Sequence, residues 1–164
     1  MAAQNPSREE ELVNKLKAQF PNSIKGSKIE GTHRVTITFD SARFLEIAKF
    51  MRDNLSLDHV KGVAGIDEPT HKIIKVLYFI GCMSKQEIED LIVVLETQLD
   101  RTNPTIASAV SIWPSAHFHE RETFEMFGVK FEGHPDLRKL LTLDNWEGPP
   151  PMLKDIKFPE MGQR

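Results

Sequence analysis

The amino-acid sequence predicts an α+β fold, in which helices pack on a mainly antiparallel sheet of about four strands, followed by an irregular, proline-rich C-terminal tail. Apolar residues recur at helical spacing over 8–20 and 41–55. They alternate with polar residues over 34–39, and two strand-like apolar runs, 57–66 and 73–80, flank the turn-forming segment DEPTHK. A chain of 164 residues that is 40% hydrophobic is long enough to bury its own core.

The first element should be a helix. Ser7 followed three residues later by Glu10 is a capping-box pattern, and Pro21 ends the helical spacing. We therefore expect a helix over about 8–20. A polar link then leads to the strand at 34–39.

A second helix should follow this strand. Asp40 or Ser41 can cap it, because a short polar side chain accepts a hydrogen bond from the first free amides of a helix. Its apolar stripe consists of Phe44, Leu45, Ile47, Ala48, Met51 and Leu55.

Residues 57–80 have the pattern of a β-hairpin. Gly62 and Gly65 weaken its first strand and indicate bulges or close backbone approach. Residues 84–98 are ambiguous, because their start favours a helical turn by capping chemistry whereas LIVVLETQL favours a strand by residue type. We expect a short turn followed by a strand over 91–98.

Side-chain chemistry is concentrated between Trp113 and Leu141. We expect a two-turn helix over 119–127 ended by Gly128, a short strand over 129–131, a turn and a short helix over 137–141.

The chain divides at residue 141. We expect 1–141 to form a single α+β domain and 142–164 to be a C-terminal extension, because periodicity disappears there and four prolines interrupt it. The extension still carries apolar residues, so it is either packed irregularly or laid over a partner.

Composition excludes several classes of function. A net charge of -3 and a pI near 6.1 give no basic field, so we expect no nucleic-acid partner. The single cysteine, Cys82, cannot form an internal disulfide or hold a zinc ion or iron–sulfur cluster alone, and its apolar neighbours predict a buried, inert thiol. No apolar stretch approaches the roughly 18 residues that span a bilayer, and the N-terminus lacks a targeting pattern, so we expect a soluble, cytoplasmic chain.

Catalytic motifs are weak. His117, His119 and Glu120, with His134, could form a two-histidine, one-carboxylate metal site, but their spacing is not that of a defined motif. Glycine-rich phosphate-binding and serine-nucleophile motifs are absent.

A carboxylate pair for general acid–base catalysis is a further possibility. Glu120, Glu122 and Glu125 supply the groups, but carboxylates interleaved with Arg121 are more typical of an ion-paired scaffold. By elimination the residues favour a binding or scaffolding module over a self-contained catalyst.

The run ERETFEMFGVKFEGHPDLRKLL resembles the signature of the 30-kDa subunit of respiratory complex I, also called the C subunit of NADH:quinone oxidoreductase. The resemblance covers about residues 104–155. One departure is Leu153, which stands where the family commonly has arginine. The motif and its flanks supply the expected site and subunit-interface residues: Glu120, Arg121, Glu122, Glu125, Phe127, Gly128, His134, Pro135, Arg138, Trp146, Lys154 and Asp155.

The resemblance implies a non-catalytic subunit in the hydrophilic arm of a membrane-bound, ion-translocating oxidoreductase. Such a protein carries no cofactor, catalytic residue or metal; it braces a large subunit, which forms the quinone pocket or holds a nickel–iron centre, and a small iron–sulfur subunit. It would be peripheral, on the cytoplasmic face of the membrane, with its tail wrapped on a partner and its Glu-Arg-Glu helix acting as a buried ion-pair scaffold. Quinone reduction coupled to proton pumping is the favoured activity of the complex, and an energy-converting hydrogenase or F420-linked dehydrogenase is the alternative.

Overall fold

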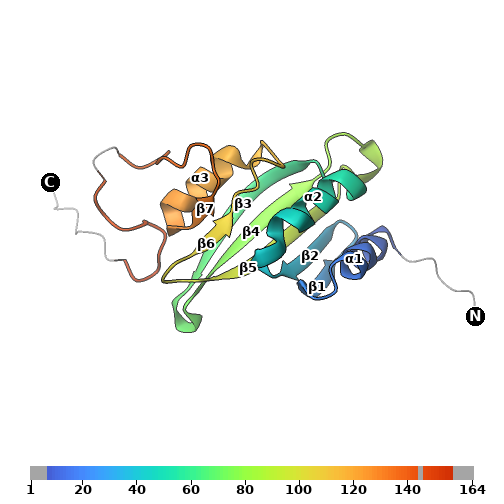
Figure 1. The fold of residues 1–164 in the computed structure, drawn as a ribbon, viewed down its shortest axis with the longest axis horizontal. Helices are drawn as coiled ribbons and strands as arrows, with labels where there is room; N and C mark the ends of the chain where they lie inside the picture. Colours follow the sequence, from blue (N-terminus) through green and yellow to red (C-terminus); the bar gives the residue numbers. More distant parts are fainter. Residues whose placement is uncertain (1–6, 144–145, 157–164) are drawn as a thin grey trace, which may run out of the picture.

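The structure, a computed structural model, describes residues 7–143 and 146–156 and consists of a helical layer on one face of a sheet (Figure 1). The strands of the sheet are β1 (Ile24–Glu30), β2 (Arg34–Phe39), β3 (His59–Glu68), β4 (Ile73–Gly81) and β5 (Ile92–Asp100). The helices are α1 (Arg8–Gln19), α2 (Phe44–Leu55) and α3 (Ala116–Phe127). A separate pair of short parallel strands consists of β6 (Thr105–Ala107) and β7 (Lys130–Glu132), and the single 3-10 turns are η1 (Ser41–Arg43), η2 (Pro69–His71) and η3 (Gln86–Ile88).

The sheet has the order β1-β2-β5-β4-β3 and is mainly antiparallel, with β2 and β5 as its one parallel pair. The predicted α+β class is therefore confirmed, with five strands in place of about four. Alternate residues of β4 give the sheet its two faces: Ile74, Val76, Tyr78 and Ile80 are buried on the helix side, where the Tyr78 ring lies 4.8 Å from that of Phe44 of α2.

Local sequence chemistry explains the first two helices. Ser7 accepts from the amide of Glu10 while the Glu10 carboxylate accepts from the amide of Ser7, so the predicted capping box is confirmed. Asp40 accepts from the amide of Ala42 and caps η1, which leads directly into α2.

Both predicted glycine features of β3 are confirmed. The pairing register of β3 with β4 shifts between Val60 and Gly62, which is a bulge. At Gly65 an added Cβ would lie 2.4 Å from the ring of Phe127, so only glycine lets α3 approach β3 so closely.

Four details of the predicted secondary structure were wrong. The polar link contains β1, an edge strand whose mixed polarity hides its period, and β6 was not predicted at all. Helix α3 begins at Ala116, three residues before the predicted start, and has 12 residues. No helix forms over 137–141, because the amides of Leu140 and Leu141 donate to the side chain of Glu125 and not to helical carbonyls.

Cys82 is buried, as predicted. Within the described ranges, no helix has both the length and the apolar character needed to cross a lipid bilayer. The last residues of the predicted extension, 157–164, lie outside the described part, as do 144–145.

Candidate functional site

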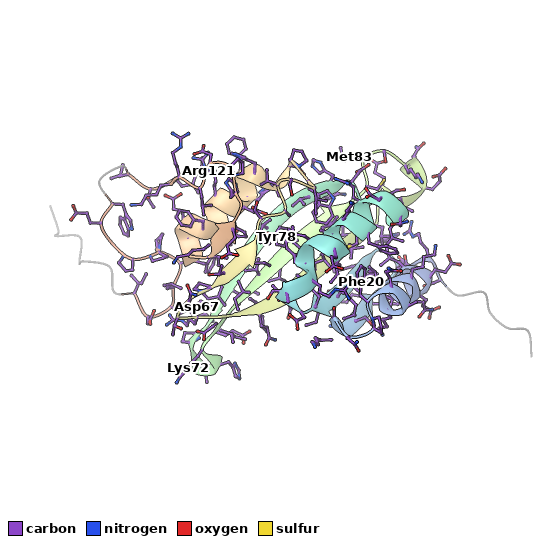
Figure 2. All side chains as sticks on the ribbon, viewed as in Figure 1. Phe20, Asp67, Lys72, Tyr78, Met83 and Arg121 are labelled. Atoms are coloured by element: carbon purple, nitrogen blue, oxygen red, sulfur yellow. The ribbon has the colours of Figure 1, made fainter. Side chains whose placement is uncertain are left out.

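The family-motif residues gather on α3 and the segment that follows it. Figure 2 shows Arg121 at this helix and Tyr78 to one side of it, near the middle of the sheet. The first motif residue, Glu120, has no exposed surface. Its carboxylate accepts hydrogen bonds from the Tyr78 hydroxyl at 2.9 Å, the Ser108 hydroxyl at 2.6 Å and the amide of Ala109 at 2.8 Å.

Glu120 therefore does not pair with Arg121. Its hydrogen bonds anchor α3 to the core of the protein. Burial raises the pKa of Glu120 above its ordinary value, although its three hydrogen-bond donors act in the opposite direction. Burial and the neighbouring Glu120 carboxylate also raise the pKa of Tyr78. This network fixes where the exposed face of α3 points.

Arg121 and Glu125 hold the segment 138–142 by its backbone. The Arg121 guanidinium donates to the carbonyl oxygens of Arg138 at 3.1 Å and Lys139 at 3.0 Å. The Glu125 carboxylate accepts from the amides of Leu140, Leu141 and Thr142 at 2.7, 2.7 and 2.6 Å, and from the Thr142 hydroxyl. We call this arrangement the backbone clamp.

The predicted ion-pair scaffold within the Glu-Arg-Glu run was wrong. The only carboxylate within ion-pair distance of Arg121, among the described residues, is that of Asp136 at 4.0 Å. Glu122 is exposed and takes no part in the clamp. A buried guanidinium and a buried carboxylate thus make their hydrogen bonds mainly to main-chain groups of one segment. The side chains of Leu140 and Leu141 take no part in these bonds.

Charge on Glu125 strengthens the clamp. Burial alone would raise the pKa of Glu125, but hydrogen bonds from the Thr142 side chain and from three successive amides lower it to about 2. The carboxylate is therefore fully ionised at neutral pH, and each of its amide bonds is charge-assisted.

Because the clamp takes up the backbone, the two leucines of this segment and Leu143 directly after it face outward. Leu141 and Leu143 are 60% and 74% exposed, and Leu140 is 37% exposed. Met152 and Phe118, nearby in sequence or on α3, are 55% and 60% exposed. A fixed segment that displays apolar side chains has the character of a docking surface.

The C-terminal segment is anchored to the β3–β4 end of the sheet. Asp67 is almost fully buried and accepts from Arg101 at 2.6 and 3.0 Å and from the amide of Lys154 at 2.8 Å. Arg101 also donates to Asp155 at 2.6 Å. The Arg101 hydrogen bond, opposed by burial, lowers the pKa of Asp67, so the anchor is ionic. Figure 2 shows Asp67 near the tip of this hairpin.

Helix α3 and the C-terminal segment together cover the edge of β3. The amide of Val60 donates to the Ser115 hydroxyl at 2.9 Å, and the Thr123 hydroxyl donates to the carbonyl of Val63 at 3.3 Å. Unpaired edge groups of a strand invite pairing with other chains, so this coverage protects the sheet.

The remaining predicted residues shape the ends of these elements. Gly128 has φ of +75° and ends α3, as predicted. The Trp146 ring packs on Gly148, and its carbonyl accepts from the Lys139 ammonium at 2.5 Å. Pro135 is exposed and follows the turn that carries His134.

The histidines do not assemble a metal site. The rings of His117 and His134 lie 4.7 Å apart, but the amide of Asp136 donates to Nδ1 of His134. Nε2 of His134 lies 3.1 Å from the carbonyl of His117, which only accepts, so both ring nitrogens are occupied. No group of three or more His, Cys, Asp or Glu side chains is placed to hold a metal in the described ranges.

The sequence interpretation missed Tyr78, Ser108, Asp67 and Arg101. Each contacts a motif or tail residue across at least 12 positions of sequence, and none stands in a recognisable spacing. Ser108 is a polar residue within the apolar run IASAV, which was an available indication, whereas Asp67 and Arg101 adjoin other polar residues and gave no such signal.

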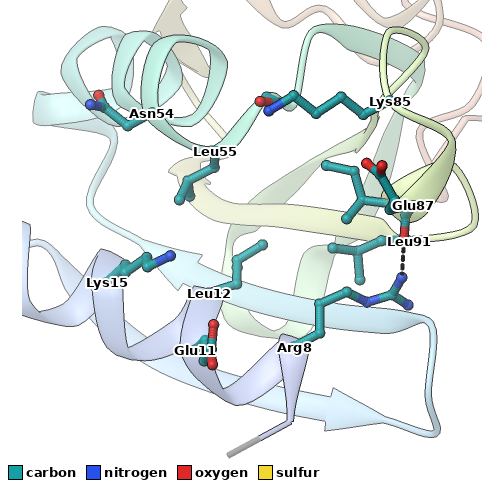
Figure 3. Close-up of a pocket in the computed structure, with 11 residues that line it drawn as sticks. Arg8, Glu11, Leu12, Lys15, Asn54, Leu55, Lys85, Glu87 and Leu91 are labelled. Carbon is teal, nitrogen blue, oxygen red and sulfur yellow. Dashed lines mark hydrogen bonds between the residues drawn. The ribbon is translucent and has the colours of Figure 1, made fainter.

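One hollow of the surface lies away from α3 and its motif residues. It opens between α1, the end of α2 and η3, with an apolar floor that includes Leu12 and Leu91 (Figure 3). Arg8 at its rim is already bound to the Glu87 carbonyl at 2.9 Å and to Asp90 at 2.8 Å. This hollow shares no residue with the backbone clamp.

Comparison with known sequences identifies relatives of the whole chain. Residues 37–161 match the family described as "Respiratory-chain NADH dehydrogenase, 30 Kd subunit". The C subunit of F(420)H(2) dehydrogenase from Methanosarcina mazei is 30% identical over 93% of this chain and 95% of that protein. The C subunit of NADH-quinone oxidoreductase from Roseiflexus sp. is 32% identical over 88% of this chain and 82% of that protein.

Solved structures share the fold. A chain of the membrane-bound sulfane sulfur reductase, an archaeal respiratory membrane complex, superposes with a TM-score of 0.77 at 20% identity, over 90% of this chain and 85% of that chain. A trypsin-resistant fragment of Nqo5 superposes with a TM-score of 0.64 at 22% identity, over 78% of this chain and 98% of that fragment.

Proposed function

This chain belongs to the family of the respiratory-chain NADH dehydrogenase 30 Kd subunit, and from that premise we propose that it is a structural subunit of a membrane-bound oxidoreductase complex. Its task would be to brace neighbouring subunits of the hydrophilic arm. It would carry no active site or cofactor of its own, and the iron–sulfur clusters would lie in its partners.

The observation that carries this proposal is the backbone clamp. Arg121 and Glu125 are both almost buried, and both hold main-chain groups of 138–142. The side chains exposed at this place are those of Leu140, Leu141 and Leu143. Geometry of this kind suits recognition of a protein surface.

Within the complex we propose two partners: a large subunit that forms the quinone site and a small iron–sulfur subunit. The chain would sit peripherally on the cytoplasmic face of the membrane, and its extension 142–164 would wrap one partner. The complex would be of the complex I type, passing electrons to quinone and pumping protons.

An F420-linked dehydrogenase is a second candidate. It is supported by the similarity to the C subunit of F(420)H(2) dehydrogenase, which spans nearly the full length of both chains. An energy-converting nickel–iron hydrogenase is a third possibility, and metal content separates it from the other two.

The test is a tagged pull-down of the full chain from detergent-solubilised membranes, with mass spectrometry of partners and iron and nickel analysis of the eluate. We expect iron–sulfur subunits, and iron without nickel. Oxidation of NADH or of reduced F420 by the eluate then assigns the donor. Nickel in stoichiometric amount would instead indicate the hydrogenase, and recovery of the chain alone would overturn the proposal.

A further inference from the structure

A groove of about 290 Å³ lies between the outer side of α3 and the edge strand β3. It is separate from the clamp: none of Arg121, Glu125 or the leucine segment lines it. The lining that matters here comes from three parts of the chain: Val63 and Ala64 of β3, Glu122, Met126 and Phe127 of α3, and Met152 of the C-terminal segment.

The groove is lined mainly by apolar side chains, together with one charged side chain. Met126 is half-buried and Met152 is 55% exposed, and methionine side chains adapt their shape to what they contact. Glu122 is the single charged side chain in the lining. Among the residues that the structure describes, no cation or hydrogen-bond donor meets its carboxylate.

The face of α3 that borders the groove carries one further exposed aromatic side chain, Phe118. Phe118, Glu122 and Met126 stand four residues apart, so they lie on one face of the helix. Phe118 is 60% exposed, an unusual state for a phenylalanine on a helix anchored so firmly by Glu120. The resulting face is apolar at both ends, with a carboxylate between them.

We propose that this groove docks an apolar segment of a neighbouring subunit, one that carries a lysine or arginine side chain to meet Glu122. The inference rests on the proposed function, since it assumes an assembled complex. The carboxylate would repel an anionic lipid headgroup or a nucleic acid. A symmetric contact with a second copy would bring two Glu122 carboxylates together, so that occupant is also disfavoured.

The test compares Glu122→Arg, Glu122→Gln and a matched control in the tagged full-length chain. The control is Glu11→Arg on α1, which is also exposed, lacks a partner among the described residues and lies at the other end of the sheet (Figure 1). We expect Glu122→Arg to lower the recovery of complex subunits about tenfold, Glu122→Gln to give an intermediate loss, and Glu11→Arg to stay within about twofold of the original chain. Unchanged melting temperatures would show that each variant is folded.

A photo-crosslinking amino acid at position 126 identifies the occupant. We expect a crosslinked apolar peptide from another subunit that includes a lysine or arginine. Crosslinks to lipid or to a second copy of this chain, or full recovery of subunits by Glu122→Arg, would overturn the inference while leaving the proposed function intact. If the original chain recovers no subunits at all, both fail together.

Discussion

At the scale of single residues, three neighbours on α3 have three different tasks. Glu120 faces the core and fixes the helix on Tyr78, whereas Arg121 and Glu125, which are also buried, hold the backbone of the 138–142 segment. Successive side chains of a helix point in different directions, so a dense charged run need not form pairs with itself. The sequence identifies these residues by motif, but their partners are set by the fold.

Glu125→Gln should destabilise the protein in a pH-dependent way. Since the pKa of Glu125 is lowered to about 2, its ionised form contributes stability above its ordinary pKa of 4.5, and that contribution is lost as pH falls toward 2. At neutral pH we expect a loss of about 3 kcal/mol at most in the free energy of unfolding. The difference between the two chains should shrink between pH 5 and pH 2 in denaturant titrations.

A control separates this effect from other carboxylates. Asp67 also has a lowered pKa, and the raised pKa of Glu120 contributes with the opposite sign, since it favours the fold at acid pH. Asp67 and Glu120 are present in both the original chain and Glu125→Gln, so they affect the two pH profiles equally. Glu122→Gln, on an exposed position of the same helix, should alter stability by less than about 0.5 kcal/mol. Parallel pH profiles for Glu125→Gln and the original chain would refute the role of the charge.

Arg121→Ala should loosen the 138–142 segment. It removes both donors to the carbonyls of Arg138 and Lys139, and we expect a loss of about 1–3 kcal/mol together with poorer assembly in native gels. Arg121→Lys keeps the charge but not the forked geometry that reaches two carbonyls, so it should be intermediate. Equal assembly of all three chains would mean that the clamp does not prepare the docking surface.

At the scale of elements, local patterns predicted the parts whose partners are local. The capping box of α1, most of the stripe of α2 and the hairpin of β3 and β4 follow from side-chain period and turn residues. Leu45 of the predicted stripe was wrong, since it is 39% exposed. The order of the strands and the parallel pairing of β2 with β5 depend on contacts far apart in sequence, so no local pattern could give them.

The start of α3 shows why the predicted boundaries of some helices were wrong. Ser115 is its N-cap residue but makes no capping hydrogen bond, and its hydroxyl accepts from the amide of Val60 on the neighbouring strand. Residues 137–141 have a plausible cap in Asp136, yet Glu125, 15 residues upstream of Leu140, takes the amides that a helix would need. In both places a tertiary partner overrides local propensity.

Removal of residues 142–164 should spare the cooperative fold but release the chain from its complex. The described part of this extension contacts α3 through Thr142 and Met152, and the end of the sheet through Lys154 and Asp155. The buried hydrophobic core lies within residues 12–131, so deletion should lower the melting temperature by several degrees without abolishing the transition. Differential scanning calorimetry and a tagged pull-down from membranes measure the two effects. Loss of the cooperative transition would instead show that the extension belongs to the core.

At the scale of the whole molecule, apolar exposure is uneven. Of the nine large hydrophobic side chains that the described residues expose, five lie between residues 118 and 152. The same stretch contains the backbone clamp up to Thr142 and the α3 side of the groove, and it is followed by Lys154, whose amide donates to Asp67. The opposite end, with α1 and β1, is more polar and carries lysines on the edge strand, which discourages pairing with other chains.

The central claim, that the clamped leucine segment is a docking surface, is tested most directly by the double substitution Leu141→Asp and Leu143→Asp. Both side chains are exposed, so the isolated protein should melt as the original chain does. In a tagged pull-down from membranes we predict that the partner subunits are lost, because two carboxylates would have to be buried in the interface. Recovery of the partners at the original level, from a folded double variant, would contradict the account.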